Sequence, residues 1–295
     1  MTLSMTPLEF AKKYLDLEAY MYPLETDEGT GSPGPGNVPE GWRRLPVAKY
    51  RLGASGDWRE KFWQDISSRL KGGQTTVKIK TISDEIQEVP LTREQLAFHF
   101  RFPFVGKGSP EQAQVAIQLV YWYRKCVFPP EKFVEMDFIG LDCNGFVGNY
   151  FQRVAQNISW LEADNNKDPG PTTLIGDLLA RQGKNNQIMD LNELRADETY
   201  LFGFCAPDGA IHDPSKDRPG TFGHVMITEP GTLEQIDDGW KIGVVEATAA
   251  GNRELRYLDY TITSVTRARV GTVFQVLRGS PSEKMNVRVA RLAIS

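Results

Sequence analysis

The chain has 295 residues, of which 40% are hydrophobic and 24% are charged, and its formal net charge is −4. This composition is typical of a soluble globular protein with one large domain or two ordinary ones. The slightly acidic balance, without a dense Lys/Arg cluster, argues against nucleic-acid binding, and no apolar run approaches the roughly 18 residues that cross a bilayer.

Targeting, disulfide and metal-binding patterns are not recognisable in the sequence. The N-terminus has neither a basic leader nor a continuous apolar stretch of signal-peptide length. We therefore expect a cytoplasmic protein or one delivered by a route other than Sec. The three cysteines, Cys126, Cys143 and Cys205, have the spacing of neither a zinc ribbon nor a disulfide framework, so no metal or other cofactor is predicted.

The first hundred residues carry no motif that we can assign to chemistry. In chain order they predict a helix over 6–21, a Gly/Pro-rich loop over 28–41, a helix over 57–70, a strand over 75–82 and an ambiguous stretch over 85–104. We interpret residues 1–105 as an N-terminal helical extension. It is either an independent domain or an elaboration packed on the core, and it offers a surface for a protein partner.

The remainder, residues 106–295, predicts helices first and strands afterwards. A helix over 110–127 begins at the capping residue Ser109, and a second one runs from Cys143 to about Val154. β-branched alternation then predicts strands over 199–205, 221–229, 239–247, 255–265, 272–278 and 286–293. This order favours an α+β domain.

Cys143 opens the second of these helices, directly after Asp142, which is a candidate N-cap. Unpaired backbone N–H groups and the positive end of the helix dipole surround a sulfur in the first turn and favour its thiolate form. The same N–H groups can stabilise an oxyanion on a carbonyl that the sulfur attacks. For a free cysteine the alternative is a buried structural thiol, and a partner base decides between the two.

Three histidines are available as that base. His99 lies among phenylalanines and is typical of a structural histidine, whereas His212 lies in a Pro/Asp-rich loop. His224 begins a predicted strand, which makes it the best positioned candidate. Glu246 ends the next strand, and if the two strands are adjacent and antiparallel, through a short connection at Asp237-Asp238-Gly239, it can hold the imidazole.

The sequence around these residues resembles a known family. Asp142-Cys143-Asn144-Gly145-Phe146-Val147 is similar to the Asp-Cys-Ser-Gly-Phe/Leu-Val signature of the NlpC-type cell-wall cysteine peptidases, a papain-like superfamily that includes the cysteine, histidine-dependent amidohydrolases. Residues 190–202 resemble the family's entry into its first barrel strand, and Gly223-His224-Val225 resembles its histidine strand. Val244-Val245-Glu246-Ala247 stands where the family has its third polar residue. The resemblance covers about residues 133–278.

The resemblance implies a papain-like fold, with a nucleophile helix packed on a small antiparallel sheet or half-barrel. It implies Cys143 as nucleophile, His224 as base and Glu246, by position alone, as third residue. Asp142, Asn144 and Gly223 are carried over as substrate-binding residues.

This sequence departs from the family pattern in several places. Asn144 replaces a serine, Glu246 replaces a histidine, asparagine or glutamine, and the family's tyrosine upstream of the cysteine has no counterpart. The interval between Cys143 and His224 is longer than is common, so we expect 165–186 and 206–220 to be insertions beside the cleft.

The predicted function is therefore that of a cysteine hydrolase without a cofactor. It would cleave an amide bond, first of all in a peptidoglycan stem peptide or a related peptide, through an acyl-enzyme. Two alternatives remain open from the sequence. One is a papain-like scaffold that has lost turnover and acts as a binding module, and the other is acyl transfer to an amine or lipid.

Overall fold

The structure, a computed structural model, describes residues 3–22, 40–51, 56–70, 74–123, 129–135, 138–163, 169–211, 223–249, 254–279 and 283–294. Packing divides the chain into two compact units. Unit 1 comprises Met1–Ala11, Cys143–Ala247 and Arg256–Ser295, and unit 2 comprises Lys12–Asp142 and Thr248–Leu255. The expected boundary near residue 105 coincides with neither unit, because residues 106–142 pack with the preceding part of the chain.

Unit 2 is built around a buried helix. Its elements are the end of α1 (Pro7–Leu15), β1 (Glu18–Met21), β2 (Gly41–Arg44), α2 (Gly56–Arg69), β3 (Gln74–Lys80), β4 (Ile86–Thr92), α3 (Arg93–Arg101), a 3-10 turn (Pro103–Val105), α4 (Pro110–Trp122) and α5 (Pro130–Glu135). The strands form two antiparallel pairs, β1 with β2 and β3 with β4. α4 packs against β1, β3 and α3, and residues 110–121 are all buried.

Most of the elements predicted for this part of the chain are confirmed, with two corrections. The helix predicted over 6–21 ends at Leu15, and the chain then forms β1. The ambiguous stretch contains β4 and α3. Its alternating phenylalanines are two helical pairs, because Phe98 contacts Phe102 at 5.0 Å and Phe100 contacts Phe104 at 4.9 Å between ring centroids. The alternation of a strand, which repeats every second residue, and two interleaved helical i, i+4 pairs place phenylalanines at the same sequence positions.

His99 is a structural histidine in unit 2. The imidazole is 2% exposed, and Gln112 Nε2 lies 3.1 Å from His99 Nδ1. Gln112 Oε1 accepts the backbone N–H of Ser109 in a capping box, which fixes the orientation of the amide, so Nε2 donates and Nδ1 accepts. Burial lowers the pKa of His99 to about 4, which keeps the ring neutral at neutral pH.

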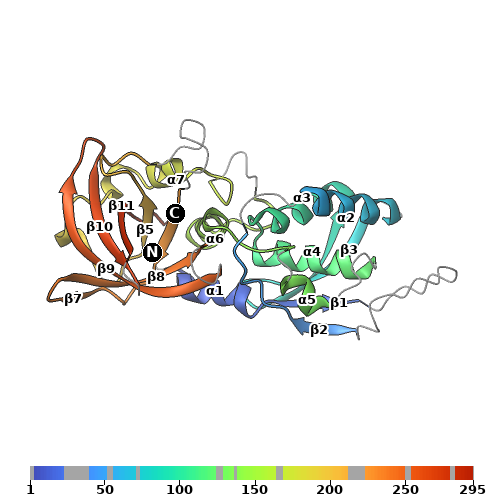
Figure 1. The fold of residues 1–295 in the computed structure, drawn as a ribbon. Coiled ribbons are helices and arrows are strands. Elements are labelled where there is room, and N and C mark those ends of the chain that lie inside the picture. The colour runs from blue at the N-terminus through green and yellow to red at the C-terminus, as the bar shows by residue number, and fades with distance from the viewer. Residues whose placement is uncertain are drawn as a thin grey trace. The chain divides into compact units, whose positions relative to one another are not determined.

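Unit 1 holds a closed barrel beside a short helix (Figure 1). Its helical elements are the start of α1, α6 (Cys143–Tyr150), the π-helical turn η2 (Phe151–Ala155), α7 (Ile175–Arg181) and the 3-10 turns Lys184–Asn186 and Leu191–Glu193. Its strands are β5 (Tyr200–Phe204), β6 (Val225–Thr228), β7 (Glu234–Ile236), β8 (Gly239–Ala247), β9 (Leu255–Arg267), β10 (Thr272–Arg278) and β11 (Glu283–Arg291). The sheet order is β6-β5-β11-β10-β9-β8-β7, and an additional pairing of β6 with β8 closes six of the strands into a ring.

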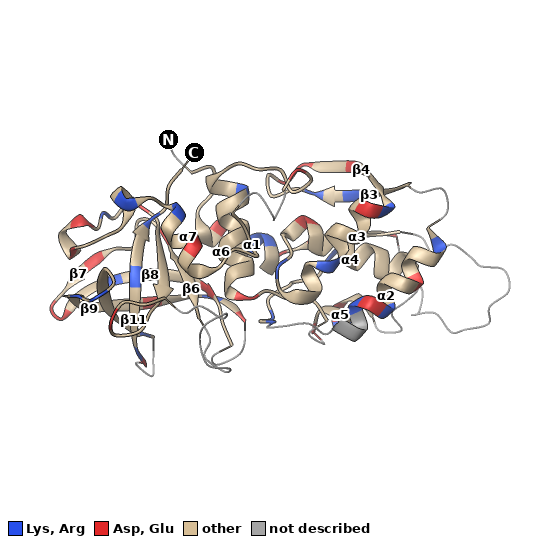
Figure 2. Cartoon of the chain, turned by 90° about the horizontal axis from the view of Figure 1, so that it is seen from above, with Lys and Arg blue, Asp and Glu red and all other residues tan. Residues whose placement is uncertain are grey.

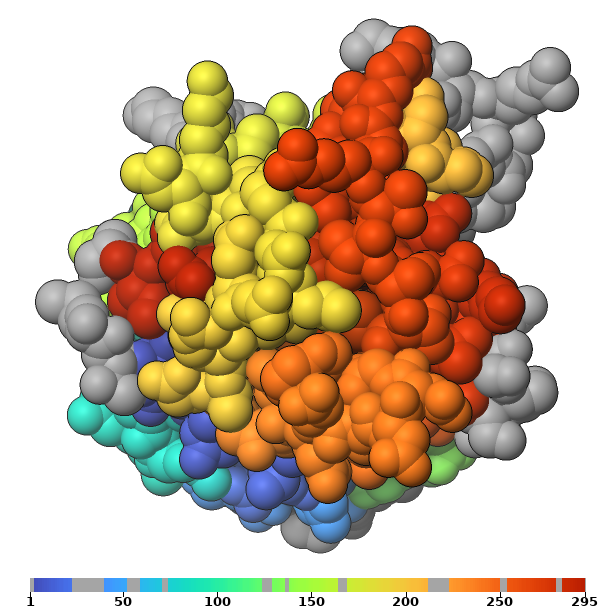
Figure 3. Space-filling model, turned by 90° about the vertical axis from the view of Figure 1, so that its left-hand side faces the viewer, coloured from blue at the N-terminus to red at the C-terminus, as the bar shows by residue number. Residues whose placement is uncertain are grey.

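The barrel has a core of inward-facing apolar residues. Phe202, Met226, Val244, Ile262 and Phe274 are each fully buried within one cluster. The connection from α7 to β5 packs Ile188 and Leu194 onto this cluster, and Figure 3 shows that yellow segment lying beside the red-orange strands β9 and β10.

The strand predictions for unit 1 are confirmed, and 239–247 and 272–278 have the predicted bounds. One strand was not predicted. β7 pairs with β8 in the register Ile236↔Gly239, so the turn at Asp237 and Asp238 joins β7 to β8 rather than β6 to β8. The adjacency of β6 and β8 nevertheless holds, with Ile227 opposite Val245.

Charged residues of both signs are interspersed along the elements (Figure 2). In the part of the chain that the structure describes, no helix has the length and apolarity needed to span a membrane.

Candidate active site

Five polar side chains meet where the inward-facing pattern of the barrel strands turns from apolar to polar. On β8 the inward positions Ile242 and Val244 are followed by Glu246, and on β10 Phe274 and Val276 are followed by Arg278. His224 directly precedes β6, and Arg256 and Tyr260 lie near the start of β9. Neighbouring antiparallel strands bring starts and ends together, so these residues share one end of the barrel.

His224 and Glu246 are joined by a hydrogen bond of 2.8 Å between His224 Nε2 and Glu246 Oε2. The pairing of β6 with β8, extended by one pair, sets Glu246 opposite Met226 and one diagonal step from His224. An ionised carboxylate only accepts hydrogen bonds, so Nε2 carries a proton and donates it. The other ring nitrogen, Nδ1, is therefore the one that remains for a further partner.

That partner is Cys143, the first residue of α6. The thiol lies close enough to the imidazole for Cys143 to raise the pKa of His224. α6 packs against β6 and β8, and its apolar residues Phe146, Val147 and Tyr150 are fully buried. Phe10 of α1 contacts Phe146 at 5.9 Å between ring centroids. The packing thus holds the N-terminus of α6 at the polar end of the barrel.

Glu246 is completely buried, and each of its oxygens has its own partners. Oε1 accepts from Arg278 Nη2 at 2.6 Å and from Arg256 Nε at 3.2 Å. Oε2 accepts from His224 and from the Tyr260 hydroxyl at 3.1 Å. All the acceptor directions of the carboxylate are used, so its orientation toward His224 is fixed.

The two ionisable partners shift one another's pKa in opposite directions. Burial by itself would lower the pKa of His224, but the hydrogen bonds and charges of Cys143 and Glu246 raise it well above its ordinary value. Burial would raise the pKa of Glu246, yet the hydrogen bond and charge of His224 and the charge of Arg278 hold it well below its ordinary value. The site therefore favours an imidazolium at His224 beside an ionised Glu246 carboxylate.

The structure brings together the predicted nucleophile, base and third residue. The three residues expected to bind substrate have other surroundings. Asp142 pairs with Lys107 Nζ at 2.7 Å within unit 2, and its capping role stays a prediction. Asn144 donates one Nδ2 hydrogen to the Thr173 carbonyl at 3.1 Å, while its buried Oδ1 has no hydrogen-bond partner. Gly223 precedes His224 outside the strand.

Two candidates considered in the sequence, Cys126 and His212, lie outside the described residues, as do parts of both expected insertions. Cys205 is half-buried, and burial raises the pKa of its thiol to about 11.

Sequence reasoning missed the groups that hold Glu246, namely Arg256, Tyr260 and Arg278. A signal was present for the last of these. Arg278 occupies an inward position of β10, two residues after Val276, where an apolar side chain would continue the core. A cation at a core position of an otherwise apolar strand indicates a buried anion as its partner.

Gly148 lets a loop approach α6 beside the cysteine. A Cβ there would lie 2.4 Å from the Gly170 carbonyl carbon and oxygen and 2.5 Å from Pro171 Cα, all backbone atoms. The same loop supplies the Thr173 carbonyl that Asn144 contacts.

We expect Gly148→Ala to lower the free energy of unfolding by about 1–2 kcal/mol, because overpacking exceeds the helix-propensity gain of about 1 kcal/mol. Urea denaturation measures this. Gly176→Ala in α7 is the matched control, since its Cβ would meet only Ile211 at an ordinary 3.7 Å, and it should stabilise the protein. Equal stability of the two variants would contradict the close approach.

Solvent reaches little of Cys143 and His224. Cys143 is 6% exposed, and the His224 side chain is 12% exposed. Unit 1 has a cavity near its terminal segments, and none of Cys143, His224 and Glu246 lines it. Among the described residues, no group of three or more His, Cys, Asp or Glu side chains has a metal-binding arrangement.

No protein-family model matches the chain, and neither a curated protein nor a solved structure is significantly similar to it. The functional argument therefore depends on the chain's own residues and geometry.

Proposed function

We propose that the protein is a papain-like cysteine hydrolase that cleaves an amide bond through an acyl-enzyme. The observation that carries this proposal is that Cys143 and Glu246 flank His224: Glu246 is hydrogen-bonded to the imidazole, both residues raise its pKa, and the sulfur stands at a helix N-terminus. A nucleophile, a base and a group that orients the base are the parts that thiol catalysis requires.

Each step follows from the tautomer of His224. Its Nδ1 takes the thiol proton, and Cys143 Sγ attacks the amide carbonyl carbon. The N–H groups at the start of α6 stabilise the resulting oxyanion. Nδ1 then protonates the leaving amine as the C–N bond breaks, which leaves a thioester. Water, deprotonated by Nδ1, attacks the thioester and releases the carboxylic acid and the thiol.

The free-energy cost of burying the charged groups around Glu246 favours a functional interpretation of them over a structural one. Buried ion pairs contribute little net stability, and well-packed apolar residues of similar volume often serve a core better. The rest of the barrel interior is apolar, yet this end holds a carboxylate, two guanidinium groups and a histidine. A purely structural role does not require that arrangement, whereas orienting and charging an imidazole does.

The reaction can be tested with peptidoglycan stem peptides and unrelated peptides in water enriched in heavy oxygen, read by mass spectrometry. Hydrolysis should yield a new amine and an acid that carries one heavy oxygen. If a product instead gains an added amine or lipid, the same site performs acyl transfer. A folded protein that cleaves none of the panel, and whose Cys143 resists acylating peptide probes, would contradict the proposal and favour a binding module.

A further inference from the structure

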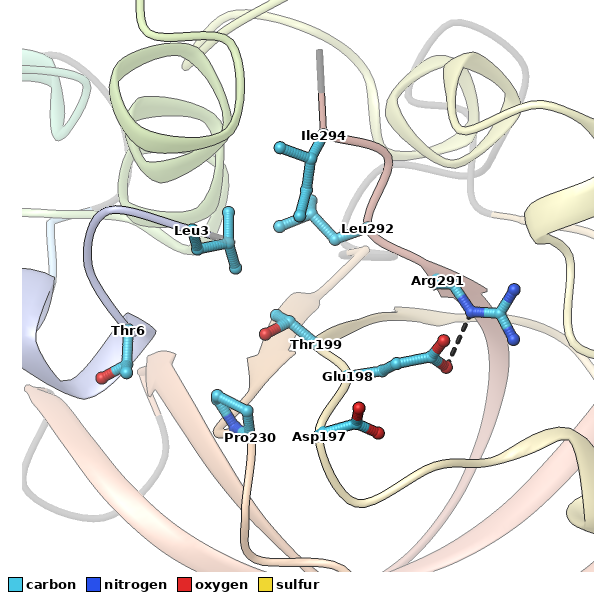
Figure 4. A pocket seen from close by; sticks show the side chains of 9 residues that line it. All are labelled: Leu3, Thr6, Asp197, Glu198, Thr199, Pro230, Arg291, Leu292 and Ile294. Carbon is cyan, nitrogen blue, oxygen red and sulfur yellow. Dashed lines mark hydrogen bonds and ion pairs between the residues drawn. The ribbon is translucent and has the colours of Figure 1, made fainter. Parts of the chain in front are cut away.

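Unit 1 has a cavity of about 450 Å³ where its two terminal segments meet (Figure 4). It lies within the size range of small-ligand sites. The lining residues are Leu3, Thr6, Asp197, Glu198, Thr199, Pro230, Arg291, Leu292 and Ile294. None of them belongs to the cysteine site, so the cavity calls for an explanation of its own.

Thr199 presents an unused polar group to this cavity. The residue is 5% exposed, and its Oγ1 is buried without a hydrogen-bond partner. The Thr199 carbonyl, in contrast, accepts the Leu292 N–H at 2.9 Å. Figure 4 shows the hydroxyl on the side that faces Leu3 and Thr6. Because an unpaired buried hydroxyl is unfavourable, the site is suited to a ligand that supplies a polar group there.

The charges of the cavity favour a cation. Glu198 accepts from Arg291 Nε and from the Tyr200 hydroxyl, each at 2.7 Å, so that carboxylate is neutralised within the protein. Asp197 is exposed and makes no hydrogen bond or ion pair with any described residue. It leaves the site with one uncompensated negative charge next to the Glu198–Arg291 pair.

The opposite side of the cavity is apolar. Leu3, Leu292 and Ile294 line it, and Ile294 leaves 38% of its surface exposed. In Figure 4 these three side chains lie on the far side of Thr199 from Asp197 and Glu198. Across the cavity, the Asp197 carboxylate is therefore followed by the Thr199 hydroxyl and then by the apolar side chains.

We propose that this cavity binds the free N-terminus of a short apolar peptide. The α-ammonium group pairs with Asp197, the first peptide group hydrogen-bonds with Thr199 Oγ1, and the apolar side chains pack on Leu3, Leu292 and Ile294. A simple alkylammonium ion matches the two ends of the site but leaves the hydroxyl unpaired. The peptide satisfies all three features, and its binding requires no chemistry at Cys143.

The test uses the full-length chain with Cys143→Ala, so that no turnover of a peptide interferes. Calorimetric titration compares leucyl-leucinamide, its N-acetyl derivative and octylamine. We expect the free dipeptide amide to bind and the N-acetyl form to bind at least about tenfold more weakly, which is the loss of one favourable charge pairing. Equal binding of the acetylated peptide, or of octylamine, would overturn the assignment, as would no binding of leucyl-leucinamide at millimolar concentration.

Three variants localise the binding. Asp197→Asn should weaken it about tenfold and Thr199→Val several-fold, whereas Glu234→Gln, on the exposed strand β7, should leave it unchanged. Thr199→Val also separates a ligand role from a structural one. Because the hydroxyl has no partner in the fold, its removal should leave the melting temperature unchanged or higher. A lower melting temperature with unchanged affinity would contradict the proposed contact.

Discussion

Replacing Cys143 with alanine should abolish both amide cleavage and covalent labelling of that residue by iodoacetamide at neutral pH. The expected effect is a complete loss of the chemical step, because the proposed pathway forms its thioester on this sulfur alone. Labelling should succeed in the wild type, since the thiol begins α6 and lies beside the His224 imidazole, whose raised pKa makes it a good acceptor of the thiol proton.

Cys205 is the matched control for reactivity in the same protein. Burial raises the pKa of its thiol to about 11, so it should remain almost unlabelled at neutral pH. Peptide mapping by mass spectrometry distinguishes the two positions. Cleavage that persists in folded Cys143→Ala, or labelling of Cys205 ahead of Cys143, would show that the reactive group has been misassigned.

Replacing Glu246 with glutamine should reduce turnover by roughly 10²- to 10⁴-fold and destabilise the fold by about 3–5 kcal/mol. The change leaves Arg278 without its anion at 2.6 Å and replaces one acceptor of the His224 proton with a neutral group. Urea denaturation and turnover, measured on the same preparation, provide the two values.

Glu283→Gln is the control, since it removes the other carboxylate near Arg278. That pair is 3.7 Å apart and the Glu283 side chain is 64% exposed, so the expected change is below about 1 kcal/mol. Similar losses of stability and turnover in Glu246→Gln and Glu283→Gln would contradict the proposed contribution of the buried ion pairs.

The pH dependence follows from the raised pKa of His224. The imidazolium is stabilised in the folded protein, so its contribution to stability is fully present below the unfolded-state pKa and is lost as pH rises through the raised folded-state pKa. Activity that depends on the His224 imidazolium should fail over the same alkaline range. In Glu246→Gln that limit should move to lower pH, and an unchanged limit would argue against the role of the carboxylate.

The predictable part of the site was the part with local sequence signals. Cys143 begins a helix whose apolar spacing is visible, and His224 and Glu246 lie at the ends of strands with β-branched alternation. The groups that hold Glu246, namely Arg256, Tyr260 and Arg278, were not predictable in the same way. Arg256 lies on β9, beside β8, and Arg278 lies on β10, the next strand of the sheet. Their contact with Glu246 depends on strand register and on which face each residue occupies, which the residue patterns alone do not specify.

The same limit explains the errors in the fold. Predicted strand bounds were accurate where alternation was strong, as in β8 and β10. β7 is a three-residue strand with exposed and half-buried residues, so it has no apolar face to detect. The alternating phenylalanines over 98–104, which extend from α3 into the following 3-10 turn, fit a strand and a helix equally well, and the i, i+4 contact of Phe100 with Phe104 is the helical alternative.

The closed ring of strands also bears on synthesis in the cell. β5 lies between β6 and β11, and β11 is the last of these strands in chain order. Cys143, His224 and Glu246 therefore emerge well before the strand that completes their support, as does Arg278. A nascent chain arrested short of β11 has all the reactive groups but lacks the ring that holds them in register. Reactivity should thus begin only once β11 has been synthesised and has paired with β5 and β10.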